Sequence, residues 1–270
     1  MDGEPVQQVE EARLLLDARK ELYGETDPET IDAMRQLASA LRNAESYNEA
    51  ESVLRTSLSI QNRSNPSDEA RITRTEFDLA IVLDRLGETD SARRVWERVL
   101  EASDRANGFD SEPSIRAARN LAITLRKLRR HGDEFPLRVR VLESTRRSHG
   151  PEHVETYRAM VDLAQTHRSL GNHEMALSLF TEAVAGLERN DVEPRTVLYQ
   201  KWAIASELIA LKRRKEASLM FDQVVAGAID QLDPSDPFRK SATRQARAYR
   251  LLGRFSRSDR KAPQQGPQSP

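Results

Sequence analysis

The residues best suited to chemistry are few, and their spacing builds no catalytic or metal site. The five histidines form no HExxH motif and pair with no carboxylate at metal-ligand spacing on one helix. The chain has no cysteine, which excludes disulfides, thiolate metal sites and a cysteine nucleophile. A phosphate-binding glycine loop, a GxSxG motif and a dinucleotide fingerprint are also absent from the sequence. We therefore expect a protein that is not an enzyme, with no cofactor and no small-molecule substrate.

The composition is typical of stacked helices. Of the 270 residues, 38% are hydrophobic, which is enough for a core, while only 5% are aromatic. The formal net charge of −1 argues against a general nucleic-acid binder, so we consider nucleic acid an unfavoured partner. The N-terminus has neither a basic start nor an apolar run, and no stretch approaches the roughly 20 apolar residues that span a bilayer. These features predict a cytoplasmic protein without membrane insertion.

An internal repeat decides the predicted fold. The dipeptide Leu-Ala recurs every 42 residues, at positions 37–38, 79–80, 121–122 and 163–164. With one step of 41 the same pattern continues at Ile204-Ala205 and then at Ala246. Within each repeat the apolar residues fall at i, i+3, i+4 and i+7, in two blocks that a turn separates. The sequence therefore predicts an all-α, right-handed solenoid of antiparallel helix pairs, with about six repeats that are incomplete at both ends.

Small residues and turn residues support this interpretation. Gly87, Gly171 and Gly253 occupy the turn between the two helices, where a positive φ ends the first helix. His167 stands where three other repeats have Leu, and we interpret it as a substitution within the packing. Close helix contacts are expected at alanines of the first helices, namely Ala38, Ala80, Ala122, Ala164, Ala205 and Ala246.

The pattern of Leu-Ala, Gly, Ala and a large apolar residue resembles the tetratricopeptide repeat, in its 42-residue, kinesin-light-chain-like variant. That variant opens its repeats with Gly, acid, Pro and Thr, as in residues 24–30 and 150–156 here. The core of the motif matches at Arg119-Asn120-Leu121-Ala122 and at residues 171–176, and the resemblance covers roughly residues 8 to 255. It implies a peptide-binding or protein-binding scaffold with a concave groove lined by the first helix of each repeat.

One repeat departs from the pattern. At residues 113–150, Arg129 replaces the turn glycine, Glu134 the small alanine and Arg138 the large apolar residue. Pro136 lies near the start of the second helix, and proline is tolerated in a first helical turn. We expect a local irregularity near residues 129–140, with a second helix that begins late. The sequence leaves open whether this is a hinge or only a drifted repeat.

The expected organisation is a solenoid at residues 9–256, between a disordered N-terminus (1–8) and a disordered tail (257–270) whose composition lacks hydrophobic residues. The repeats are placed at approximately 9–24, 27–66, 68–109, 113–150, 152–190, 194–233 and 236–256.

The positions that the resemblance places in the groove are strongly basic. Only Asp32 and Asp84 oppose these cations there, which favours an acidic ligand held by arginine forks. The alternative is that the cations are solvated or pair with acids of neighbouring helices. The candidate partner-binding residues are Arg35, Arg42, Arg74, Arg85, Arg116, Arg119, Asn120, Ile123, Arg126, Lys127, Arg158 and Arg168.

Two further surfaces complete the set of candidates. Tyr199 and Trp202 lie at the same positions of the 194–233 repeat, where they either anchor an apolar group of the ligand or are covered by the next helix. The last helix carries a stripe of cations that either caps the array or binds an acidic partner, nucleic acid or an anionic membrane, namely Lys240, Arg244, Arg247, Arg250, Arg254 and Arg257.

We therefore expect a non-catalytic scaffold or adaptor that binds a peptide or partner segment in the concave groove. Because the groove is basic, we expect this segment to be acidic. The alternative is a peptide-sensing regulatory module that works with a DNA-binding or nucleotide-hydrolysing domain, and the irregular repeat fits that idea.

Leu14, Leu15 and Leu16 belong to a second helix without its own first helix. Self-association at this N-terminal edge is a further possibility.

Overall fold

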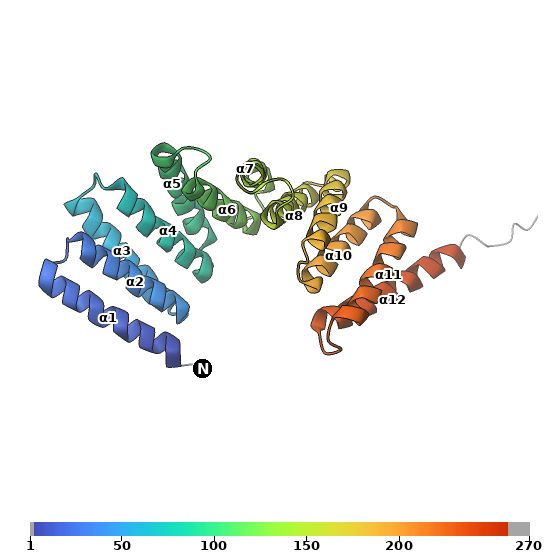
Figure 1. The fold of residues 1–270 in the computed structure, drawn as a ribbon, viewed down its shortest axis with the longest axis horizontal. Coiled ribbons are helices and arrows are strands. Elements are labelled where there is room, and N and C mark those ends of the chain that lie inside the picture. Colours follow the sequence, from blue (N-terminus) through green and yellow to red (C-terminus); the bar gives the residue numbers. More distant parts are fainter. Residues whose placement is uncertain (1–2, 259–270) are drawn as a thin grey trace, which may run out of the picture. The chain divides into compact units, whose positions relative to one another are not determined.

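The computed structural model describes residues 3–258, with side chains described for residues 5–247, and shows only α-helices in that range. The all-α solenoid fold is confirmed. The twelve helices of the described residues are α1 (Gly3–Tyr23), α2 (Pro28–Asn43), α3 (Tyr47–Ser64), α4 (Glu69–Leu86), α5 (Thr89–Asn107), α6 (Glu112–Lys127), α7 (His131–His149), α8 (Val154–Ser169), α9 (His173–Arg189), α10 (Pro194–Ala210), α11 (Arg214–Gln231) and α12 (Pro237–Ser258) (Figure 1).

The chain divides into two compact units, an N-terminal unit (Met1–Ser144) and a C-terminal unit (Thr145–Pro270). In the N-terminal unit, consecutive helices from α1 to α6 pack on one another, and the first helices α2 and α4 also touch. In the C-terminal unit, α8 to α12 pack in the same consecutive way. The boundary falls inside α7, in the repeat where the sequence predicts an irregularity.

The cores are built as the repeat predicts. The alanines expected at close contacts, from Ala38 to Ala246, are all buried. In the N-terminal unit Ala38 and Ala80 belong to one hydrophobic cluster with Leu37, Leu79 and Leu121, and this cluster also contains Trp96. Ser111 and Asp68 accept hydrogen bonds from backbone N–H groups in the first turns of α6 and α4, and so fix where those helices begin.

In the five repeats whose two helices both lie within the described residues, the turn between those helices has a left-handed residue, whether or not that residue is glycine. The expectation that Gly253 lies in such a turn is wrong, because α12 continues through it to Ser258. Gly87 and Gly171 have φ of 80° and 78°. The equivalent Glu45, Arg129 and Lys212 have φ of 58°, 57° and 61°. The repeat therefore fixes the turn geometry, and the non-glycine residues adopt it at a steric cost.

The helices extend beyond the expected solenoid at both ends. Residues 3–8 belong to α1 rather than to a disordered N-terminus, because Pro5 is tolerated in a first helical turn and Gln7 donates a hydrogen bond to Glu11 one turn later (2.9 Å). At the other end α12 continues to Ser258, and the rest of the expected tail, residues 259–270, lies outside the described residues.

The irregular repeat also differs from the expectation. α7 begins at His131 and keeps Pro136 inside it, rather than beginning late. Proline cannot donate to the carbonyl of Gly132, but both residues are exposed, so water can satisfy that carbonyl. The replaced apolar position is occupied by a buried ion pair, described below.

The turn geometry gives a direct test. Gly87→Ala should destabilise the protein by about 1 kcal/mol, because a β-carbon disfavours the left-handed conformation. No atom lies within 4 Å of the added β-carbon, so the cost comes from the backbone alone. Gly132→Ala is the matched control: it is equally open but helical, and should be neutral or stabilising by up to about 1 kcal/mol. Urea unfolding of both variants measures the difference, and equal effects would contradict this account.

His167 provides a pH-dependent test. Burial lowers the pKa of this histidine below its ordinary value of 6.5, because the charged imidazolium is disfavoured in the core. The unfolded chain therefore binds the proton at a higher pH than the folded chain, so the His167 contribution to stability is full above pH 6.5 and falls as the pH drops below it. In His167→Leu, which restores the leucine found at this position in other repeats, the loss of stability at low pH that comes from His167 should disappear. The stability gap between the variant and the wild type should widen from pH 7.5 to pH 5.5 in urea unfolding; a constant gap would contradict it.

Candidate partner-binding surface

The candidate surface of the N-terminal unit is formed by one stripe of side chains on each of the first helices α2, α4 and α6, and we call it the first-helix surface. Equivalent positions on these helices are 42 residues apart. Each stripe uses steps of three and four residues, so its members share one helix face. The structure divides the predicted cations on this surface into held and available groups.

Four arginines of this surface form no ion pair within the described residues. Arg74 and Arg85 of α4 are exposed, and Arg42 and Arg119 are half-buried. Arg42 donates a hydrogen bond to the hydroxyl of Ser39 (3.1 Å). The charge of Arg74 contributes to a lowered pKa of Asp68, although the main cause there is the hydrogen bond from Arg71. These four guanidinium groups are available to a ligand.

Two other cations pair with acids of the neighbouring first helix. Arg35 contacts Asp78 on α4 (2.9 Å), and Lys127 contacts Asp84 on α4 (2.9 Å). Both pairs join residues 43 apart in the sequence, one repeat plus one residue. The expectation that only Asp32 and Asp84 oppose the cations missed Asp78. Opposite charges spaced by one repeat plus one residue were the signal that could have identified it.

Asp84 is a structural carboxylate rather than a free acid. It accepts hydrogen bonds from Trp96 Nε1 (2.9 Å) and from the Thr124 hydroxyl (2.8 Å), besides its contact with Lys127. Because α4, α5 and α6 all contribute to this group, Lys127 holds the helices together. We therefore assign Lys127 to the fold.

Two fully buried carboxylates hold further candidate arginines. Glu134 lies 3.0 Å from Arg138 and 3.7 Å from Arg126, and neither Glu134 nor Arg138 is exposed. In the C-terminal unit, Glu207 accepts from Arg168, and it also contacts His173 Nδ1 (2.8 Å).

The two remaining candidate arginines, Arg158 and Arg116, contact an acid on their own helix and an aromatic ring of α4, respectively. Arg158 pairs with Glu155 one turn earlier on α8 (2.6 Å) and is mostly exposed. Arg116 stacks over the Phe77 ring at 5.0 Å and reaches Glu112 only at 4.0 Å. Between these cations the N-terminal unit offers the half-buried Asn120 and the exposed Ile123.

The aromatic candidates of the C-terminal unit differ from each other. Trp202 is half-buried and packs edge-on against Phe221 of α11 (4.6 Å between ring centroids). Tyr199 is 58% exposed, with its ring 6.2 Å from Phe238 of α12. Trp202 is therefore largely a core residue, whereas Tyr199 is open to solvent.

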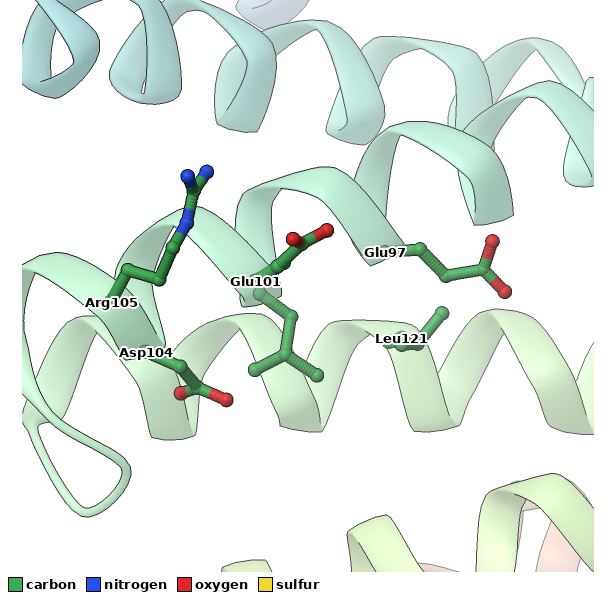
Figure 2. Close-up of a pocket in the computed structure, with 6 residues that line it drawn as sticks. Glu97, Glu101, Asp104, Arg105 and Leu121 are labelled. Carbon is green, nitrogen blue, oxygen red and sulfur yellow. The ribbon is translucent and has the colours of Figure 1, made fainter.

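A cavity of about 480 Å³ lies away from the first-helix surface, between α5 and α6. It is lined by Glu97, Leu100, Glu101, Asp104, Arg105 and Leu121. Figure 2 shows Glu97, Glu101, Asp104 and Arg105 spread along α5, with Leu121 of α6 at the Glu97 end of the group. Sequence reasoning missed this cavity, although acids at i, i+4 and i+7 on α5 were a visible signal. Asp104 is bound by Arg140 (2.6 Å) and Glu97 by Arg93 (2.6 Å), so most of the acidic charge is already neutralised.

The part of the chain that the structure describes offers neither a metal site nor a membrane span. No three His, Asp or Glu side chains there are placed to hold a metal ion. No helix in that part combines the length and the apolar character needed to cross a bilayer.

Comparison with known proteins agrees with the repeat. Two tetratricopeptide repeat families match the chain, one at residues 30–68 and 114–155 and the other at residues 135–189. No curated protein matches it.

Solved structures show the same fold at low sequence identity. BtubC (BKLC) from P. vanneervenii is 19% identical, with a TM-score of 0.68 over 87% of this chain and 93% of that chain. A putative kinesin light chain from Podospora anserina with nearly identical TPR-like repeats is 19% identical, with a TM-score of 0.66 over 77% and 99%. YrrB, described as a TPR protein with an unusual peptide-binding site, is 15% identical, with a TM-score of 0.59 over 86% and 99%.

The buried ion pair of α7 can be tested by restoring the pattern of the other repeats. Glu134→Ala should destabilise the protein by about 3–5 kcal/mol, because it leaves Arg138 buried without the carboxylate that it contacts. The double variant Glu134→Ala/Arg138→Leu replaces the pair with a small and a large apolar residue, and should recover most of that loss. Urea unfolding checks both, and additive losses would show that the two side chains do not act as a pair.

Proposed function

Because the chain is a tetratricopeptide-repeat protein with a kinesin-light-chain-like fold, we propose that it is a non-catalytic scaffold that binds an acidic segment of a partner protein on the first-helix surface. A protein-interaction role is what this repeat supports at the coarse level. The acidic character of the ligand rests on one observation, the four arginines without an ion pair on α2, α4 and α6.

The held cations sharpen this proposal. Arg35, Lys127 and Arg126 already contact carboxylates of the chain, so a ligand would have to compete with those contacts. Arg42, Arg74, Arg85 and Arg119 pay no such cost, and each guanidinium can form two parallel hydrogen bonds with a carboxylate or phosphate. An acidic ligand is therefore recognised by these four residues rather than by the whole basic set.

Their positions suggest how a ligand is spaced. Arg74 lies in the first half of α4 and Arg85 in its last turn, eleven residues later. At 1.5 Å per residue the two side chains emerge about 16 Å apart along the helix axis. An extended peptide covers that distance in about five residues, so we propose a ligand with two acidic groups at about that separation.

The test selects peptides from a random library with the wild-type protein and with the Arg74→Glu/Arg85→Glu variant. We expect peptides rich in Asp and Glu from the wild type, and at least about tenfold weaker binding of a selected peptide to the variant, corresponding to about 1.4 kcal/mol. Fluorescence anisotropy at low and high salt measures the affinity, and salt should weaken it.

The control is Arg63→Glu/Arg94→Glu, which changes the net charge equally on two exposed arginines of the second helices α3 and α5. This control should bind the peptide as the wild type does. Selected peptides without acidic enrichment, or equal loss in both variants, would overturn the proposal.

A further inference from the structure

The first and last helices each represent half of a repeat, and the two halves are of opposite type. In the register of the repeat, α1 is a second helix, because Leu16 aligns with Leu58 and Leu100. The last helix, α12, is a first helix, because Ala246 aligns with Ala205. Within the described residues α1 packs on α2 and α12 on α11, both helices of a neighbouring repeat, and each lacks the other helix of its own repeat.

On α1, the positions that a first helix covers elsewhere are open to solvent. Gln8 is exposed, whereas the equivalent Ala50, Ala92, Ala176 and Ala217 are all fully buried. Leu15 is 37% exposed. Leu22, which is 72% exposed, lies two turns further along the same helix face, at a position that is exposed in the other repeats too. The residues equivalent to Leu15 are at most 2% exposed, namely Ser57, Val99, Val141, Ala183 and Val224.

On α12, the position that a second helix covers elsewhere is also open. Gln245 is exposed. Its equivalents in the five other first helices are core residues, namely Leu37, Leu79, Leu121, Leu163 and Ile204. The neighbouring Ala242 and Ala246 are buried, so α12 itself is seated on its own unit. Within the described residues, the face that remains uncovered is the one that a second helix covers in the other repeats.

The two ends carry opposite charge. Residues 1–29 contain nine acids and three bases. Residues 237–258 contain seven arginines and lysines and no acid, and among them Lys240, Arg244 and Arg247 are exposed. Opposite fields of this size attract the two segments to each other and repel each from its own kind.

We propose that α12 of one copy of this chain packs against α1 of a second copy, so that the two helices complete a repeat across the contact. The other repeats pair their helices antiparallel about the left-handed turn residue. The same register places Leu15 of one copy beside Ser241 and Ala242 of the other, and Ala12 beside Gln245. Because two different surfaces meet, the contact is heterologous and joins copies head to tail.

A second copy is a better occupant of these faces than an unrelated helix. The α1 surface combines exposed leucines with acidic residues, so a suitable partner helix has basic side chains with apolar methylene groups. The arginines of α12 have both properties, and its alanines leave room for the leucines. The polar Gln245 and Gln8 keep the two ends soluble when apart, so the association is expected to be weak and dependent on concentration. Membrane insertion of α12 is disfavoured, because Ala242 and Ala246 are already buried within the unit.

Sedimentation velocity of the full chain tests the contact. We expect the wild type to associate at protein concentrations of about 100 µM in low salt, and the association to weaken in about 0.5 M salt. Leu15→Glu and Arg244→Glu/Gln245→Glu should each be monomeric under the same conditions. Both variants change exposed side chains, and circular dichroism confirms their folding.

Mixing the two variants gives the decisive result. Each retains one intact end, so a head-to-tail contact predicts a one-to-one heterodimer that does not grow further. Gln245→Leu, which restores the residue type of the other first helices, should tighten the association of the wild-type chain at least tenfold. A monomeric wild type would overturn the proposal, and so would continued self-association of Arg244→Glu/Gln245→Glu or a mixture that stays monomeric. Arg74→Glu/Arg85→Glu should associate normally, which separates this contact from peptide binding.

Discussion

No helix pair of this chain can bury its apolar faces by itself. In each unit a helix packs on the helices before and after it in the chain, so the core is shared between neighbouring repeats. Leu37, Leu79 and Leu121 lie in one cluster because three successive pairs are stacked. This constraint explains why the spacing of 42 residues is kept while the surface residues vary.

The same constraint shapes the first-helix surface. Stacking brings equivalent positions of neighbouring helices together, so a charge on one helix meets a charge that lies one repeat away. Arg35 with Asp78 and Lys127 with Asp84 are such pairs. Within the described residues Arg74 and Arg85 form no such pair, and this is why we propose them as contacts for a ligand. The chemistry of the surface is therefore set by which cations find no acid on the next helix.

The repeat also accommodates buried acids that depart from its usual pattern. Arg126 and Arg168 are equivalent residues, as are His131 and His173, and each pair contacts a buried carboxylate, Glu134 in one unit and Glu207 in the other. The carboxylates themselves come from different positions of the repeat. A buried acid is retained where arginine and histidine are close enough to satisfy it, even in place of the usual alanine.

The sequence by itself determined the helix order, the buried alanines and the turns at Gly87 and Gly171, though not the turn expected at Gly253, because these depend on local periodicity and on a spacing that can be counted. It also placed Arg129 at a turn that needs a positive φ. Only the tertiary structure decided that Glu134 and Arg138 are buried together, that α7 carries Pro136 inside it, and which arginines are held. The contacts that hold Arg35, Lys127 and Arg168 join helices 39 to 43 residues apart in the sequence, and no spacing within one helix gives those distances.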